Sequence, residues 1–257
     1  MSGPDPRERT ADSTSDRSAP DPRAERESGS GGGGLPAGLL AAAVIALLGV
    51  LGIGTRYFVH GDLNAAYVLL SLFFSTNLTI CYWEVCLFLR RDQIEQRAGY
   101  WRDWQRRSGR SPAVKFLASR VPLRRALSPT VWADAWATYS QFDGSFADRR
   151  TYGFNIDIAN GFFTPVPSLF LYAAFTIEFL PATVAGILGV MLFWQWTYGT
   201  SLYWVSFFVA GRQHRITKGQ LCTFIGAMNA PWVLCALAGL YVSVRLILDG
   251  GYGVLGH

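Results

Sequence analysis

Apolar residues are gathered into long runs along this chain, without the regular polar interruptions of an amphipathic pattern. Five such runs each contain no more than two charged residues. Each run reaches the roughly 20 residues with which an α-helix crosses the hydrocarbon core of a bilayer. A soluble α/β protein would need polar residues within these stretches. The pattern therefore predicts an all-α integral membrane protein, a five-helix bundle with spans at about residues 35–53, 63–89, 153–180, 181–210 and 221–248.

The chain outside these spans divides into a tail and a long connection. Residues 1–34 are rich in Ser, Gly, Pro, Asp and Arg and are predicted to be a disordered tail. The first apolar run follows this mixed-charge tail, so it is expected to be a retained helix and not a cleaved signal peptide. Within the membrane domain, residues 35–248, the basic connection 90–152 contains the segment RAGYWRDWQRR. Its clustered aromatic and basic residues favour an amphipathic helix on the membrane surface.

Basic residues indicate how the chain is oriented. With five spans, the tail, the 90–152 connection and the loop 211–220 lie on one side and hold five, thirteen and three Lys or Arg. The other side holds only Arg56 and Arg245, so the N-terminus is expected in the cytoplasm. The net charge of +5 has the same source and favours contact with anionic lipid headgroups, not nucleic acid. The Ala-, Gly- and Arg-rich composition favours a bacterial inner membrane, with the endoplasmic reticulum membrane as the alternative.

Cysteine and histidine give no indication of a metal or cofactor. The four cysteines all lie within predicted spans, where they behave as small apolar residues. His60, His214 and His257 all lie outside the spans, which argues against an intramembrane haem or histidine metal site. The sequence contains no Gly-rich phosphate loop, no CxxC and no GxSxG, so no cofactor is predicted.

Two acidic residues stand inside the apolar runs. A charge within the bilayer costs several kcal/mol, so it usually lines a cavity or pairs with another group. Glu84 lies near the end of the second run and Asp157 near the start of the third, within roughly 6–8 Å of the same membrane boundary. Helical spacing places Asn77 on the face of Glu84, and Asn160 on the face of Asp157.

Polar and aromatic residues of the last two runs extend this constellation. They are Tyr198 and Tyr203 of the fourth run and Asn229 and Trp232 of the fifth. Polar stripes from four helices would then converge in one half of the bilayer. This arrangement predicts a lipid-accessible pocket with an acidic, aromatic lining.

Simpler explanations stay open for these residues. Glu84 would pair at the interface with the arginines that follow it, and Asp157 would cap the start of its helix. Asn229 would form a hydrogen bond between helices. Tryptophan and tyrosine gather at membrane boundaries, which explains Trp196 and its aromatic neighbours without any site.

Four short patterns follow one another along residues 35–248. They are Glu84; Trp136, Tyr139, Asp143 and Asp157; Tyr198, Gly199 and Tyr203; and Asn229 and Trp232. In order and spacing they resemble the emopamil-binding protein family of the EXPERA superfamily, five-helix membrane proteins whose best-known member is the sterol Δ8–Δ7 isomerase. The chain departs from the isomerases at Ile80, where they have a histidine, and at Thr200, where they have an acid.

The resemblance implies an intramembrane isomerase that acts on a sterol-like or other polycyclic isoprenoid lipid. The isomerases protonate a ring alkene and then remove a proton from a neighbouring carbon, while carboxylates and an aromatic face stabilise the cation formed between the two steps. Glu84 and Asp157 would be the acid–base pair, Asn229 and Tyr203 the orienting groups, and Trp232 the aromatic face beside the cation.

Two other functions are compatible with the same residues. The first is a non-catalytic protein that binds or traffics a sterol or a cationic amphiphile in the same pocket, which Ile80 in place of the family histidine favours. The second is an assembly subunit whose polar residues only hold helices together. The sequence leaves open which lipid binds, and whether the chain is a monomer or a homodimer.

Overall fold

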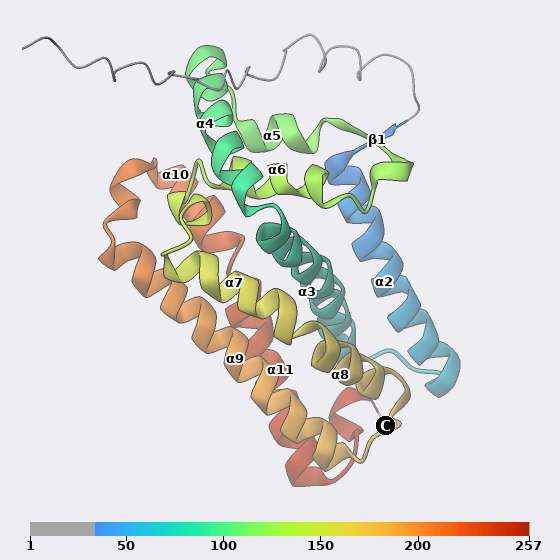
Figure 1. Ribbon diagram of the computed structural model, residues 1–257. Helices are drawn as coiled ribbons and strands as arrows, with labels where there is room; N and C mark the ends of the chain where they lie inside the picture. Colours follow the sequence, from blue (N-terminus) through green and yellow to red (C-terminus); the bar gives the residue numbers. More distant parts are fainter. Residues whose placement is uncertain (1–33, 257) are drawn as a thin grey trace, which may run out of the picture. The chain divides into compact units, whose positions relative to one another are not determined.

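The computed structural model describes residues 34–256, which are mainly helical (Figure 1). The tail predicted over residues 1–34 lies, except for Gly34, outside the described residues. Six of the described helices pack side by side into a bundle. They are α2 (Ala37–His60), α3 (Ala65–Leu89), α7 (Tyr152–Phe163), α8 (Pro165–Ile177), α9 (Ala182–Val209) and α11 (Pro231–Asp249).

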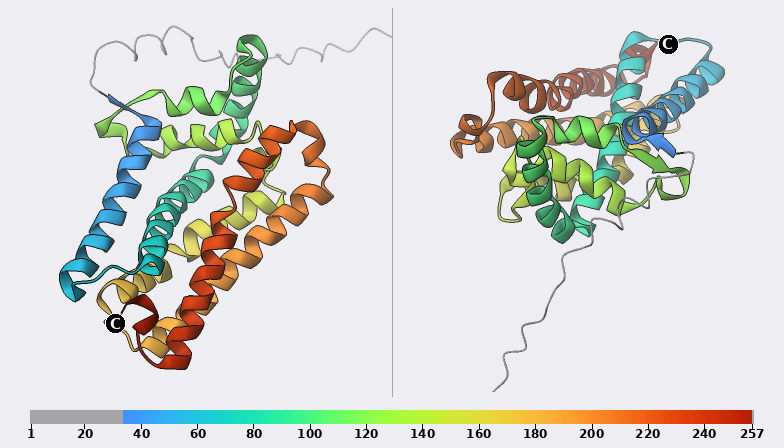
Figure 2. Two further views of the ribbon diagram at one scale, coloured as in Figure 1. Left: turned by 180° about the vertical axis from the view of Figure 1, so that it is seen from behind. Right: turned by 90° about the horizontal axis from the view of Figure 1, so that it is seen from above.

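A second group of elements, named the cap below, covers one end of this bundle (Figures 1 and 2). The remaining short elements connect α9 to α11 and close the described part of the chain. The cap consists of α4 (Arg91–Ser108), α5 (Pro112–Leu117), β2 (Arg120–Pro122), η1 (Leu123–Arg125), α6 (Pro129–Tyr139) and η2 (Gly144–Ala147), and β2 pairs with β1 (Gly34–Pro36). The others are η3 (Arg212–Arg215), α10 (Lys218–Gln220), the π-helical segment η4 (Leu221–Ala227) and η5 (Gly253–Leu255).

Within residues 34–256, three helices are long and apolar enough to cross a membrane. They are α2, α3 and the run Lys218–Asp249, which joins α10, η4 and α11. The α7–α8 pair adds a fourth span if its two halves are counted together. The 28-residue α9 carries no charge but is not among these three candidate spans. Helices able to span a membrane are thus present, three of them or four with the α7–α8 pair, and the predicted count of five is not confirmed.

The third predicted span is not one straight helix. It breaks at Thr164, and α7 and α8 meet at an angle of 54°. Pro165 causes the break, because proline has no N–H and its ring clashes with the carbonyl of the preceding turn. Pro165 instead occupies the first position of α8, where its fixed backbone angle suits a helix start.

Glycines allow the bundle helices to approach one another closely. A Cβ at Gly239 of α11 would lie 2.4 Å from the ring of Phe193 in α9. A Cβ at Gly189 of α9 would lie 2.1 Å from the hydroxyl of Ser243 in α11. Such contacts between small residues are a common way for membrane helices to pack. The central helix is α3, which packs against α2, α6, α7, α8 and α11.

The amphipathic helix expected in the connection is present as α4, and its apolar face is buried within the protein. Ile94, Ala98 and Trp101 are buried, and α4 packs against α6 through them. The indole N–H of Trp101 donates to Asp134 Oδ1 of α6 at 3.1 Å. The same buried cluster includes Leu87 of α3, Phe154 of α7 and Phe207 of α9, so the core between α4 and α6 continues into the bundle.

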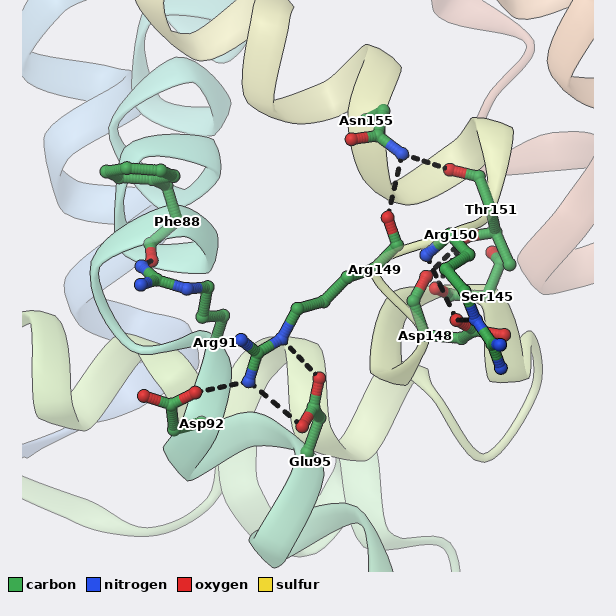
Figure 3. Close-up of polar contacts among 10 residues, drawn as sticks. All are labelled: Phe88, Arg91, Asp92, Glu95, Ser145, Asp148, Arg149, Arg150, Thr151 and Asn155. Carbon is green, nitrogen blue, oxygen red and sulfur yellow. Dashed lines mark hydrogen bonds and ion pairs between the residues drawn. The ribbon is translucent and has the colours of Figure 1, made fainter.

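One arginine ties the loop before α7 to α4 (Figure 3). Arg149 donates through Nε to Glu95 Oε1 at 2.6 Å and through Nη2 to Glu95 Oε2 at 3.1 Å, and it also contacts Asp92. The side chain of Asn155 in α7 donates to the carbonyl oxygen of Arg149 at 2.9 Å. Exposed ion pairs contribute little to stability, so this contact is only one of several between the cap and the rest of the protein.

Candidate functional site

A cavity of about 280 Å³ lies where the cap meets the bundle. Its walls come from α3, α7, α9, η4 and α11 on the bundle side, and from α5, α6 and η2 on the cap side. Most of the lining is apolar or aromatic. Six of the eight residues predicted for the site line this cavity: Glu84, Asp157, Asn160, Tyr203, Asn229 and Trp232.

Glu84 is held at the cavity by an asparagine of the neighbouring helix. Asn160 Nδ2 donates to both carboxyl oxygens of Glu84, at 2.9 Å and 2.7 Å. The side-chain oxygen of Asn160 accepts from Trp196 Nε1 and from the hydroxyl of Thr164, both at 3.1 Å. These two donors fix which way the amide points, so its NH2 group faces Glu84. Glu84 is only 4% exposed, and an interfacial pairing with the following arginines is therefore wrong.

Asp157 also lines the cavity but forms no hydrogen bond with any of residues 34–256. It does not cap its helix, since the side chain of Thr151 accepts from the N–H of Phe154 and caps α7 one and a half turns earlier. The cap explanation for Asp157 is therefore wrong. A carboxyl group inside an apolar cavity without a partner is costly, which makes it a candidate to contact a ligand.

A chain of hydrogen bonds runs from Trp232 to the residues that hold Glu84. Trp232 Nε1 donates to Asn77 Oδ1 at 2.9 Å, and Asn77 Nδ2 donates to Cys81 Sγ at 3.5 Å. Cys81 Sγ lies 3.3 Å from the hydroxyl of Thr164, which contacts Asn160. Asn77 is fully buried and does not line the cavity. It orients the Trp232 ring instead of touching what the cavity holds.

Tyr203 is fixed by a buried ion pair on the cap side. Its hydroxyl donates to Asp143 Oδ2 at 2.9 Å, and Arg212 Nη1 lies 3.2 Å from Asp143 Oδ1. Asp143 is fully buried and also accepts from the N–H of Ser145. The sequence pattern included Asp143, but Arg212 counted there only toward the orientation of the chain.

Asn229 holds the π-helical segment η4. Its Nδ2 atom donates to the carbonyl oxygens of Phe224 and Ile225, both at 3.1 Å, and lies 3.2 Å from the hydroxyl of Tyr139. Tyr139 in turn donates to the carbonyl oxygen of Phe224 at 3.0 Å. Burial raises the pKa of the Tyr139 hydroxyl, so this group stays a protonated donor. Through these bonds Asn229 supports the wall of the cavity that joins the cap to α11. π-Helical turns such as η4 are rare in proteins overall, and those that occur are often found at functional sites.

Tyr198 lies outside the cavity, contrary to the predicted site. It is 52% exposed and stacks on Trp194 with a ring separation of 5.9 Å. Trp196, explained above by the membrane boundary, is buried, lines the cavity and binds Asn160. Sequence analysis also missed most of the aromatic lining, which comes from Trp83 of α3 and from the cap residues Trp136, Tyr139 and Phe146.

The close approach of α7 to α3 at Glu84 depends on Gly161. A Cβ at this position would lie 2.7 Å from Glu84 Cβ and 3.0 Å from the backbone nitrogen of Val85. Gly161→Ala is therefore expected to move α7 away from α3, weaken the Asn160–Glu84 hydrogen bonds and destabilise the protein by about 1–3 kcal/mol.

Gly199→Ala is the matched control in this experiment. Gly199 also lines the cavity, but its added Cβ would meet only Ile156, at an ordinary 3.8 Å. Alanine favours a helix by roughly 0.5–1 kcal/mol over glycine, so this variant should be as stable as wild type or more so. Denaturation in detergent compares the two variants. Equal stability of both would contradict the role assigned to Gly161.

No protein-family model, curated protein or solved structure matches this chain. Among residues 34–256, no group of three or more His, Cys, Asp or Glu side chains is arranged to hold a metal ion.

Proposed function

We propose that this protein is an intramembrane isomerase that moves a double bond in a sterol-like or other polycyclic isoprenoid lipid. One observation carries the proposal: Glu84 and Asp157 line one aromatic cavity in unlike settings. Glu84 is bound through both oxygens, and Asp157 is bound by none of the described residues. Two carboxyl groups in unlike environments are a common arrangement for an acid and a base.

The reaction needs a proton donor and a proton acceptor, and no oxidant or reductant. One carboxyl group adds a proton to an alkene carbon, which leaves a carbocation on the adjacent carbon. The second carboxyl group, or the first after it has lost its proton, removes a proton from the next carbon, and the double bond forms there. General acid–base catalysis of this kind contributes about 10²–10⁴ in rate.

Aromatic rings suit the cation that forms between the two proton transfers. The Trp232 ring is fixed by its bond to Asn77, and Trp196 by its bond to Asn160. A cation over such a ring is stabilised by about 0.5–2 kcal/mol. A stable ammonium group on an apolar molecule resembles this cation in charge, and it should bind in the same cavity.

A second candidate is binding or trafficking of a sterol or cationic amphiphile without turnover. It is favoured by Ile80, which lines the cavity one helical turn before Glu84 and cannot transfer a proton. In both candidates α9 and the α7–α8 pair complete a five-span bundle that resembles the EXPERA proteins, with the cap on the cytoplasmic side. The ligand reaches the cavity from the lipid of a bacterial inner membrane.

The test replaces the two carboxyl groups one at a time. Purified wild type, Glu84→Gln and Asp157→Asn are incubated with a Δ8 sterol and, separately, with a long-chain tertiary amine. Products are followed by mass spectrometry, and amine binding by the shift in melting temperature. Each substitution is expected to lower turnover at least about 100-fold, since it removes one partner of the proton transfer. Asp157→Asn is expected to weaken amine binding more than Glu84→Gln, because Glu84 is bound by Asn160 whereas Asp157 forms no hydrogen bond with any of residues 34–256.

Two acids of the cap provide matched controls. Glu95→Gln and Asp92→Asn are the same chemical changes at exposed positions outside the cavity. Both should turn over and bind like wild type. Amine binding without any product would reject the isomerase and support the second candidate. Neither binding nor product in wild type would reject both candidates.

A further inference from the structure

One segment of the cap carries only positive charge. Between Asp103 and Asp134 the chain has no acidic residue. Over the same stretch it has seven basic residues: Arg106, Arg107, Arg110, Lys115, Arg120, Arg124 and Arg125. Arg124 and Arg125, both in η1, are exposed and form no ion pair with any of residues 34–256. A surface of this kind attracts anions.

An apolar groove begins beside these two arginines. It has a volume of about 130 Å³ and is separate from the central cavity, although Trp83 contributes to the walls of both. Ala126 and Leu127, which directly follow Arg125, line the groove together with α2 and α3. Along α2 the lining extends from Leu40 to Leu48, about 12 Å of helix.

Hydrogen bonds hold the loop at the upper end of the groove in place. Trp132 Nε1 donates to the carbonyl oxygen of Ala126 at 2.6 Å. The hydroxyl of Tyr82 donates to the carbonyl oxygen of Leu127. Leu123 and Leu127 are nevertheless 63% and 77% exposed. Strand β2, just before this loop, pairs with β1, which leads directly into the membrane-spanning α2. The loop thus lies at the level where α2 begins, the level of the lipid headgroups.

We propose that η1 and the groove below it form a binding site for an anionic phospholipid. Arg124 and Arg125 bind the phosphate of the headgroup, and one acyl chain lies in the groove between α2 and α3. Leu123 and Leu127 insert among the neighbouring lipid chains. A cation cluster directly above an apolar groove matches a lipid that carries its charge at one end. The site is independent of what the central cavity binds.

The test compares lipids that differ only in headgroup. The full chain in detergent is titrated with dioleoyl-phosphatidylglycerol or dioleoyl-phosphatidylcholine, and bound lipid is counted by native mass spectrometry. Wild type is expected to prefer the phosphatidylglycerol. The double variant Arg124→Gln/Arg125→Gln should lose this preference by roughly 10- to 30-fold, as expected for two cations near an anionic headgroup.

Two further variants test whether the location of the arginines and the open groove are both needed. Arg106→Gln/Arg107→Gln removes the same charge from the exposed end of α4 and should retain the preference. Val44→Trp fills the groove from α2 and should weaken binding of both lipids. If both arginine variants lost the preference for phosphatidylglycerol equally, only the overall charge would attract the lipid, and the proposed site would be wrong. A wild-type protein that binds the two lipids equally would also overturn the site. Amine binding in the central cavity, measured on the same samples, should be unchanged in all variants.

Discussion

Asn160→Leu is expected to lower the free energy of unfolding by about 2–4 kcal/mol and to abolish turnover. The side chain of Asn160 satisfies three buried groups at once: the Glu84 carboxyl, Trp196 Nε1 and the Thr164 hydroxyl. Leucine has nearly the same size but offers neither donors nor an acceptor. A buried polar group that loses its partner costs about 1–3 kcal/mol. Thr164 keeps its bond to the Asn160 backbone oxygen, so most of the loss comes from Glu84 and Trp196.

A double variant separates this effect from simple misfolding. Glu84→Leu/Asn160→Leu removes the carboxyl group together with its donor, and replacing both partners of a hydrogen bond by apolar groups is nearly neutral. The double variant should therefore be more stable than Asn160→Leu alone in urea or thermal denaturation. Asn155→Leu, at an exposed position of the same helix, should lose less than about 1 kcal/mol, the net worth of an ordinary hydrogen bond. A double variant less stable than the single one would contradict the assigned pairing.

The membrane helices and the meeting of Glu84, Asp157 and Asn160 could be anticipated from sequence. The length of the apolar runs predicts the helices. The equal depth of Glu84 and Asp157 in the membrane, together with the helical spacing of Asp157 and Asn160, predicts that these side chains lie close together. The pairing of Asn160 with Glu84 could not be anticipated, because it depends on the distance between α3 and α7. That distance is set by Gly161, whose role in a helix contact leaves no mark in hydropathy.

Tyr198 and Asn229 were assigned to the site from their places in the fourth and fifth runs, without regard to helical spacing. Tyr198 and Tyr203 are five residues apart, which is about 140° around an α-helix, so they cannot share one face. Only Tyr203 lines the cavity. Asn229 follows the π-helical η4, where α-helical spacing no longer applies. Its side-chain amide donates hydrogen bonds to two carbonyl oxygens of that segment.

The cap shows a different limit of sequence analysis. The apolar stripe of α4, with Ile94, Ala98 and Trp101, suits a membrane surface and a protein surface equally well. Only the fold reveals that α6 covers it. For the same reason the cap walls of the cavity, including Trp136 and Phe146, could not be assigned from their positions in the chain.

Arg56 was likewise counted only as one of two basic residues on its side of the membrane, although its surroundings are unusual. It is fully buried near the end of α2. Its guanidinium donates to the carbonyl oxygens of Phe175 at 2.7 Å and Leu255 at 2.8 Å. It also lies 3.4 Å from Glu178 and 4.8 Å from the centre of the Tyr67 ring. One side chain thus joins α2, α3, α8 and the C-terminal η5.

Arg56→Met is therefore expected to destabilise the protein by about 3–5 kcal/mol, the usual effect of removing one partner from a buried ion pair. Methionine fills the space of the aliphatic part of arginine but removes the donor of two carbonyl oxygens and one cationic partner of Glu178. The C-terminal segment should loosen first, because Arg56 holds the Leu255 carbonyl. Limited carboxypeptidase digestion would then shorten the variant faster than wild type.

Arg245→Met is the control, since it makes the same change at an exposed arginine. Arg245 pairs with Asp249 one turn later at 2.9 Å on the surface of α11. Exposed pairs of this kind contribute about 0.3–0.5 kcal/mol, so Arg245→Met should melt close to wild type. Similar melting temperatures for the two arginine variants would contradict the structural role of Arg56. A large gap between them would show that the far end of the bundle is held together by one buried charge, independently of the cavity under the cap.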